Sequence, residues 1–340
     1  MHSIKPTHLI SEIKENMRAG INTMIWGGPG IGKSEIPQQV ADSLNMTLID
    51  FRANLFDPVD VRGVPHIQAV KETGERFTRW AVPDIFPIEQ RDGETGILFI
   101  DELPTAPPAT QNAFLQLLLT RQIGDYVLPK GWSVIAAGNR LTDAAAVYQM
   151  PSPVRNRLAH YELEANLDDW VSWAYNNNIN SDLIGFIQYR PGLLYNFSAD
   201  DYAFPTPRSW SFVSNKLKYQ PEDIDHDSCF FGVSSLVGDG PAGEFIAYKE
   251  IADKLPDIDK LLEDPSKYKK DDNPAILYAL SSAVATRAKP ELMKNIMKLN
   301  DKLPVEFQVI LIKGCLAIDP NLKSDTSMRK WIVDNANVIL

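Results

Sequence analysis

The stretch GGPGIGKS at residues 27–34 decides the fold of this chain. It matches the pattern GxxxxGK[ST] at every defined position. The apolar stretch INTMIWG (21–27) before it is typical of a strand, and SEIPQQVADSLN (34–45) after it has the apolar spacing of a helix. Because strand, glycine loop and helix are the context that this pattern requires, the sequence predicts a phosphate-binding loop rather than a chance glycine-rich turn.

The predicted loop contains the groups that bind a nucleoside triphosphate. Its backbone N–H groups face phosphates at a helix N-terminus, whose dipole favours anions. Lys33 would reach the β and γ phosphate oxygens, and the Ser34 hydroxyl would take one Mg²⁺ position. The residues predicted to bind the nucleotide are Gly27, Gly28, Pro29, Gly30, Ile31, Gly32, Lys33, Ser34 and Asp101.

Two further strands place polar residues where ligands of open α/β sheets bind, at the carboxyl ends of strands. GILFID (96–101) delivers Asp101, expected to hold Mg²⁺ together with Ser34, and Glu102, expected to polarise the attacking water as general base. The alternative is a buried strand that ends in two solvated acids. WSVIAAGN (132–139) ends in Asn139, a neutral amide placed to orient that water. The alternative there is a turn-forming asparagine.

The pattern along the chain predicts an α/β fold with a parallel five-stranded sheet, helices on both faces, and an all-α region after it. The strands are expected at 21–27, 46–52, 96–101, 132–139 and 159–163, and an amphipathic helix at 1–20 precedes them. The turn-rich stretch 54–91 is too long for an ordinary connection and predicts an insertion. We expect a nucleotide-binding domain at 1–165, a helical lid at 166–220 and a helical extension at 221–340. Within the extension, the charged stretch 255–275 predicts a surface connection.

Composition narrows the class of protein. Lys and Arg number 34 against 44 Asp and Glu, so the net charge is −10, which disfavours a nucleic-acid partner. No apolar stretch reaches the length of a membrane span, and a cytoplasmic location is expected. The two cysteines exclude a disulfide framework as the organising device, and the five histidines show no metal-binding spacing.

This set of motifs resembles the AAA+ ATPases, and within them the MoxR-type branch. The resemblance covers roughly residues 4–218. It rests on GGPGIGKS as Walker A, ILFIDE (97–102) as Walker B, VIAAGNR (134–140) as the sensor 1 strand, SPVRNRLAHYEL (152–163) as an arginine-finger region and TPRSW (206–210) as sensor 2. Within the insertion, DPVDVRGVP (57–65) and RFTRWAVPDIFP (76–87) look like the family's segment after the second strand. Outside it, RQIGDYVLPKGWSVIAAGN (121–139) looks like the family's hairpin before sensor 1.

The resemblance implies roles for three arginines. Arg157 would be the finger that reaches the neighbouring subunit's nucleotide, with Arg155 as the runner-up, and Arg208 would contact the γ-phosphate of its own subunit. The alternatives are surface arginines paired with nearby acids and a solvated residue in the first turn of a helix. Two features depart from the family pattern: Arg140 follows Asn139 where many relatives have proline, and Phe77 and Trp80 do not form an obvious aromatic pore-loop pair.

The resemblance also implies a function. It predicts an ATPase with ATP and Mg²⁺ as cofactors. The resemblance further implies a homo-oligomeric, hexameric ring, which remodels a protein client together with a von Willebrand factor A domain protein. Two alternatives stay open: a DNA-handling AAA+ ATPase of clamp-loader or helicase type, and a scaffold that binds ATP without hydrolysing it. The stretch GDGPAG (238–243) fits GxGxxG formally, but Pro241 and the lack of α/β alternation favour a turn between helices.

Overall fold

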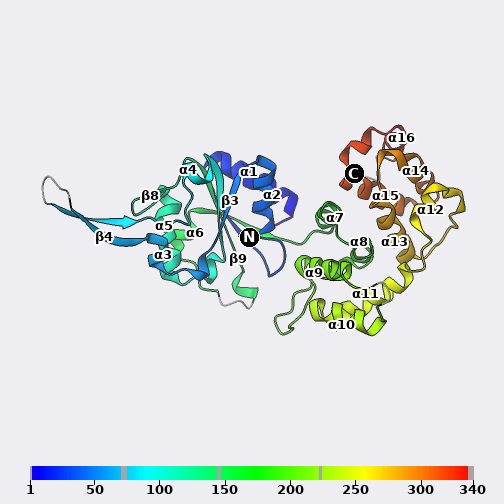
Figure 1. The fold of residues 1–340 in the computed structure, drawn as a ribbon, viewed down its shortest axis with the longest axis horizontal. Helices are drawn as coiled ribbons and strands as arrows, with labels where there is room; N and C mark the ends of the chain where they lie inside the picture. Colours follow the sequence, from blue (N-terminus) through cyan, green and yellow to red (C-terminus); the bar gives the residue numbers. More distant parts are fainter. Residues whose placement is uncertain (1, 70–74, 144–146, 222–223, 336–340) are drawn as a thin grey trace. The chain divides into compact units, whose positions relative to one another are not determined.

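The computed structural model describes residues 2–69, 75–143, 147–221 and 224–335 (Figure 1). The chain divides into two compact units, Met1–Glu164 and Ala165–Leu340, and each is described by itself. The first unit is α/β, and the described residues of the second form helices and connections with no strand, so the predicted fold class is confirmed. The division at residue 220, between lid and extension, stays a prediction.

A parallel sheet forms the centre of the first unit (Figure 1). Its strands, in spatial order, are β1 (Ser3–Ile4), β10 (Leu158–Leu163), β2 (Asn22–Trp26), β9 (Gly131–Gly138), β6 (Thr95–Asp101) and β3 (Thr47–Arg52). The five predicted strands are all present. The sequence missed β1, which pairs with β10 at one edge and makes the sheet six-stranded. The expected helix at 1–20 begins only at Pro6, because Lys5 is extended and the proline ring suits a first helical position.

Helices cover both faces of the sheet. One face packs on α1 (Pro6–Ala19) and α2 (Glu35–Leu44), and the other packs on α5 (Pro108–Thr120) and α6 (Ser152–Arg155). Residues 97–100 of strand β6 are all apolar and alternate between the two layers: Ile97 and Phe99 join the core under α1 and α2, whereas Leu98 and Ile100 join the core under α5. Burial on both faces is the reason that this strand is an unbroken apolar run.

The predicted insertion folds as α3 (Pro58–Arg62), a hairpin of β4 (Val64–Ala69) and β5 (Arg76–Ala81), and α4 (Glu89–Asp92). Residues 70–74, within the hairpin, lie outside the described part of the chain. A second hairpin, β7 (Gln122–Ile123) with β8 (Tyr126–Val127), occupies the stretch expected before the sensor strand. Its turn holds the base of the first hairpin, because the backbone N–H of Trp80 donates to Asp125. Trp80 therefore packs on its own domain, whereas Phe77 is 48% exposed.

The second unit is built from helices. They are α7 (Leu167–Asn176), α8 (Ser181–Tyr189), α9 (Pro207–Lys218), α10 (His226–Val237), α11 (Asp239–Ala252), α12 (Ile258–Glu263), α13 (Pro274–Ala285), α14 (Met293–Asn300), α15 (Val305–Ile318) and α16 (Thr326–Asp334). The expectation of a surface connection at 255–275 is wrong in part. Helix α12 lies there and buries Ile258, Leu261 and Leu262, a helical spacing that the surrounding charges and prolines obscured.

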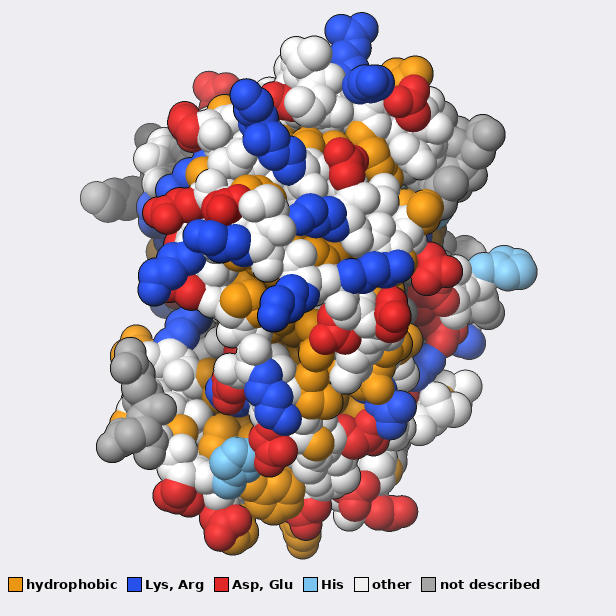
Figure 2. Space-filling model, turned by 90° about the vertical axis from the view of Figure 1, so that its right-hand side faces the viewer, with side chains coloured by type: hydrophobic (Ala, Val, Ile, Leu, Met, Phe, Trp, Pro, Cys, Tyr) orange, Lys and Arg blue, Asp and Glu red, His pale blue; other side chains and the backbone are white. Residues whose placement is uncertain are grey.

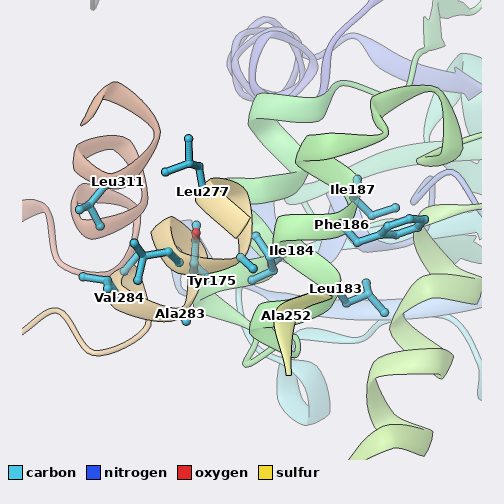
Figure 3. Packing of buried hydrophobic residues seen from close by; sticks show 14 of the residues in the cluster. Tyr175, Leu183, Ile184, Phe186, Ile187, Ala252, Leu277, Ala283, Val284 and Leu311 are labelled. Carbon is cyan, nitrogen blue, oxygen red and sulfur yellow. The ribbon is translucent and has the colours of Figure 1, made fainter. Parts of the chain in front are cut away.

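Helix α8 lies at the centre of this second core (Figure 3). Leu183, Ile184, Phe186 and Ile187 are fully buried, and α13 and α15 pack beyond them. Gly185 allows the helices to approach closely, because a Cβ atom there would lie 2.4 Å from the Tyr248 hydroxyl. The Asn180 side chain caps α8 by accepting from the amides of residues 182 and 183.

Charge is mixed on the surface of the protein. Lys and Arg side chains lie among Asp and Glu side chains on the face drawn in Figure 2. Pairs such as Lys249 with Asp253 and Arg287 with Asp259 join opposite charges in the second unit. Among the described residues, no helix is both long enough and apolar enough to cross a membrane.

Candidate active site

The loop at residues 27–34 leaves the end of β2 and enters α2. Gly30 and Gly32 have φ angles of 70° and 107°, in the left-handed region that favours glycine. A Cβ atom built on Gly32 would meet nothing within 4 Å, so open space lies beside the loop there. Ser34 is the N-cap residue of α2, and it therefore stands at the positive end of the helix dipole, which attracts an anion. The N–H groups of Glu35 and Ile36 donate to the Gly32 carbonyl.

Lys33 lies at the centre of the site and is only 7% exposed. Its Nζ atom donates to the carbonyl oxygens of Gly27 and Gly28, both at 2.9 Å, and to Oδ1 of Asn139 at 2.8 Å. Because an ammonium group has three donors, each of these contacts accounts for one of them. The structure thus brings together the predicted loop lysine and the predicted sensor asparagine.

The Ser34 hydroxyl and the Asp101 carboxylate also meet. Oγ of Ser34 donates to Oδ2 of Asp101 at 2.9 Å, and the other carboxylate oxygen accepts from the backbone N–H of Glu102. Hydroxyl and carboxylate oxygens are ligands that suit Mg²⁺, which commonly takes its remaining ligands from phosphate and water. Among the described residues no group of three or more His, Cys, Asp or Glu side chains could hold a metal. The residues present therefore fit a Mg²⁺ ion bound together with a nucleotide, not a closed protein metal site.

The carboxyl group of Asp101 also affects its neighbour on the next strand. Burial raises the pKa of Asp50 on β3, and the negative charge of Asp101 raises it further, while Arg52 lowers it. Asp101 therefore sets a negative potential at this edge of the sheet, as a site for a divalent cation requires.

Glu102 has an unusual backbone conformation, with φ at 54°. A residue other than glycine in the left-handed region carries strain, and such strain is often found at functional sites. The Glu102 side chain is also held, because the Thr105 hydroxyl donates to its Oε2 at 2.6 Å. Thr105 lies in the 3₁₀ turn that follows (Leu103–Thr105). Thr105 lies outside the motifs of the sequence, where its only signal is a hydroxyl three residues after the expected base.

The loop that follows Asn139 is fixed by Arg140. Its guanidinium group donates to both carboxylate oxygens of Asp143 and to Glu162 on β10. The hydrogen bond with Asp143 is the first cause of a raised pKa of Arg140, and Glu162 contributes as well. Arg140 thus has a structural role, because it ties the end of β9, next to Asn139, to β10.

The two candidate finger arginines differ in their surroundings. Arg155 ends α6 and is exposed, and among the described residues its guanidinium has no hydrogen-bond or ion-pair partner. Arg157 is half-buried: one terminal nitrogen donates to the carbonyl of Pro153 at 3.2 Å, while its buried Nε bonds to no described residue. Of the two guanidinium groups, that of Arg155 is the more exposed.

Arg208 lies in the second unit, at the second position of α9, and it is exposed. The sequence TPRSW starts this helix for a physical reason: the Thr206 and Ser209 side chains form a reciprocal capping box. Arg208 is not among the residues that the first unit brings together, and its predicted contact with the γ-phosphate stays a prediction.

The geometry permits phosphate binding and metal-assisted attack by water. Backbone N–H groups and Lys33 surround an anion position, Ser34 and Asp101 form a cation position, and Glu102 follows Asp101 directly. All of these groups lie at the carboxyl ends of β2, β6 and β9, where open parallel sheets bind their ligands.

No protein-family model matches the sequence, and no curated protein matches it. Among solved structures, the chain is similar to NtrX from Brucella abortus in complex with ATP, with 14% identity and a TM-score of 0.41, over 94% of this chain and 63% of that chain. It is also similar to the Thermotoga maritima RuvB Holliday junction branch migration motor, with 14% identity and a TM-score of 0.39, over 82% of this chain and 80% of that chain. The chain thus spans less than two thirds of NtrX.

Proposed function

We propose that this chain is an ATPase of the AAA+ class, of the MoxR-like branch, which hydrolyses ATP with Mg²⁺ in an assembled homo-oligomeric ring, a hexamer by family resemblance. One observation carries the proposal. Lys33 contacts Asn139, and Ser34 contacts Asp101, at the carboxyl ends of neighbouring parallel strands. A glycine-rich turn formed by chance would not collect a lysine, a metal-binding pair and a neutral amide at one point.

In this proposal each side chain has one task. Lys33 moves from its present acceptors, the Gly27 and Gly28 carbonyls, to the β and γ phosphate oxygens. Ser34 and Asp101 hold Mg²⁺, which would offset phosphate charge when bound. Glu102 takes a proton from the attacking water, and Asn139 orients that water without adding charge.

The glutamate is held in the described conformation by Thr105. If this hydrogen bond breaks, the Glu102 carboxylate is free to accept a proton from water. While the bond is present, the carboxylate accepts from the Thr105 hydroxyl instead. The proposal therefore includes a resting state in which the two residues that handle water, Glu102 and Asn139, are bonded to Thr105 and Lys33.

In the proposal, arginines supply the remaining contacts with the nucleotide. Arg157 or Arg155 contacts the nucleotide of the neighbouring subunit and stabilises charge that develops on the transferred phosphoryl group. Arg208 contacts the γ-phosphate of its own subunit and couples it to the position of the helical unit. Hydrolysis removes that contact, so movement of the helical unit performs work on a client.

The proposed client is a protein, acted on with a von Willebrand factor A domain partner. The net charge of −10 supports a protein client over a nucleic acid. The β4–β5 hairpin offers a contact surface, since Ile67 is 72% exposed and Phe77 is 48% exposed. A cytoplasmic location belongs to the same proposal.

The experiment that tests this function is an affinity purification of tagged Glu102→Gln protein from its host, with ATP and Mg²⁺ present. Loss of the base should trap the ATP state and hold the client, while a Lys33→Ala control, which cannot bind ATP, should release it. Enrichment of a von Willebrand factor A domain protein or a metalloenzyme with Glu102→Gln alone supports the proposal. Nuclease-sensitive enrichment of replication or repair proteins would instead support a DNA-handling ATPase.

A further inference from the structure

His160 on β10 lies between the phosphate loop and the segment that carries the two candidate finger arginines. The indole Nε1 of Trp26 donates to its Nδ1 at 2.9 Å, and its Nε2 contacts the backbone carbonyl of Arg155 at 2.8 Å. The rings of Trp26 and His160 are nearly parallel, with centroids 6.0 Å apart. Trp26 is the last residue of β2 and directly precedes Gly27.

These two contacts fix the tautomer of His160. An indole nitrogen can only donate and a backbone carbonyl can only accept, so Nδ1 must be the acceptor and Nε2 must carry the hydrogen. Only the neutral imidazole protonated at Nε2 satisfies both neighbours at once. His160 therefore links the two residues by accepting from the Trp26 indole and donating to the Arg155 carbonyl.

The Arg155 carbonyl needs such a partner. Helix α6 has only four residues, and no N–H group within a helix donates to its last carbonyls. The His160 N–H therefore stabilises the C-terminal end of α6. A second contact, from the neighbouring strand β2, supports the segment, because the side-chain amide of Asn22 donates to the carbonyl of Arg157 at 3.3 Å.

We infer that His160 is a positioning residue, which ties the segment 155–157 to the strand that enters the phosphate loop and so presents the finger arginine to the neighbouring subunit. The contacts continue to the nucleotide lysine, because Gly27, next to Trp26, accepts from Lys33. This inference rests on the proposed function, in which one of these arginines acts in trans. It assigns His160 no contact with nucleotide or client.

The test uses the full chain and variants that separate the two hydrogen bonds. His160→Phe removes both, and Trp26→Phe removes the indole donor. His160→Gln retains an amide donor for the Arg155 carbonyl. Tyr161→Phe is the matched control, because Tyr161 follows His160 on β10 and its hydroxyl bonds to Asn16 and Glu12 on α1, away from the arginine segment.

The first readout uses mixed assemblies, in which one kind of subunit offers the arginine (the donor subunit) and the other hydrolyses ATP. Subunits with Lys33→Ala cannot bind ATP and only offer their arginine, so they are mixed with wild-type subunits at a fixed ratio. Adding His160→Phe to the donors should lower hydrolysis by their wild-type neighbours by about tenfold, because the arginine is misplaced but not lost, and loss of a trans arginine costs about 10³-fold or more. His160→Gln donors should recover part of that loss, and Tyr161→Phe donors should match the Lys33→Ala donors.

A second readout does not depend on hydrolysis. Hydrogen exchange of the amides at residues 154–158 should speed up several-fold in His160→Phe and in Trp26→Phe, with no change in Tyr161→Phe. ATP affinity of single His160→Phe protein should stay within about twofold of wild type, because phosphate binding needs no finger. A protein without any ATPase activity would contradict the proposed function. Hydrogen exchange at residues 154–158 would still show whether His160 holds the segment 155–157 in place. Unchanged exchange, or full support of neighbours by His160→Phe donors, would overturn this inference.

Discussion

Oδ1 of Asn139 accepts a hydrogen bond from Nζ of Lys33 at 2.8 Å, although 106 residues separate the two in the chain. The contact exists because β2 and β9 are neighbours in the parallel sheet and both end at the same edge. It connects the residue expected to hold phosphate with the residue expected to orient water. In the proposed function, phosphate oxygens would compete with the Asn139 amide and with the Gly27 and Gly28 carbonyls for the three donors of this ammonium group.

Substitution of Asn139 separates these two tasks. In Asn139→Ala, Lys33 keeps both loop carbonyls, so we expect ATP affinity within about threefold of wild type and hydrolysis lowered by about 10–100-fold. In Asn139→Asp, the new carboxylate would pair with Lys33 and compete with phosphate, so affinity should fall by about tenfold or more. Calorimetric titration and a steady-state phosphate assay measure the two quantities. Equal hydrolysis by Asn139→Ala and wild type would remove Asn139 from the mechanism.

Thr105 should control the availability of the base. Thr105→Val keeps the size of the side chain and removes the hydroxyl that bonds to Glu102. We expect basal ATP hydrolysis to change by several-fold while ATP affinity stays unchanged, because Thr105 contacts the carboxylate and not the loop. Thr105→Ser, which retains the hydroxyl, is the control. A Thr105→Val enzyme with unaltered turnover would mean that the hydrogen bond has no functional role.

Mixed assemblies decide between the two finger candidates. The sequence resemblance favours Arg157, whereas the exposed and unpartnered guanidinium among the described residues belongs to Arg155. Each substitution to alanine is placed in Lys33→Ala donor subunits, which are mixed with wild-type subunits. The true finger is the arginine whose loss from the donor lowers hydrolysis by about 10³-fold in the neighbour. Equal and full support of wild-type neighbours by both donor variants would exclude a trans arginine from this segment.

Close packing in the second unit leads to a prediction on stability. Gly185→Ala places a methyl group 2.4 Å from the Tyr248 hydroxyl and 2.7 Å from the Ser282 hydroxyl. Overpacking of this kind costs about 1–3 kcal/mol of unfolding free energy. Gly192→Ala is the matched control, because a Cβ atom there meets nothing within 4 Å. Urea unfolding of the two variants measures the difference, and equal unfolding midpoints would contradict the packing described around α8.

The sequence was sufficient to predict the five longer strands of the six-stranded sheet. Each of them contains apolar residues and ends in a turn or in polar residues. It missed β1, since two residues carry no periodicity. It also missed α12, because charges and prolines surround Ile258, Leu261 and Leu262. Elements as short as β1 and α12 can be recognised only once the residues that they pack against are known.

The sequence singled out Lys33 and Ser34 because they lie in a pattern of fixed spacing, and Asp101 because it ends an apolar strand. The residues that support the site lie outside such motifs. Arg140 reaches Glu162 across 22 residues and Trp26 reaches His160 across 134 residues, so only the folded sheet brings them together. The roles of Arg155, Arg157 and Arg208 depend on other subunits or on the second unit, and they stay predictions.

The most direct test of the central claim is the rate of ATP hydrolysis, measured together with ATP affinity, for purified wild type, Lys33→Ala and Glu102→Gln in the presence of Mg²⁺. We expect hydrolysis by wild type alone, tight ATP binding by wild type and Glu102→Gln, and a loss of affinity in Lys33→Ala. Wild-type protein that binds ATP and turns over no faster than Glu102→Gln, even when assembled, would contradict the account and favour an ATP-binding scaffold.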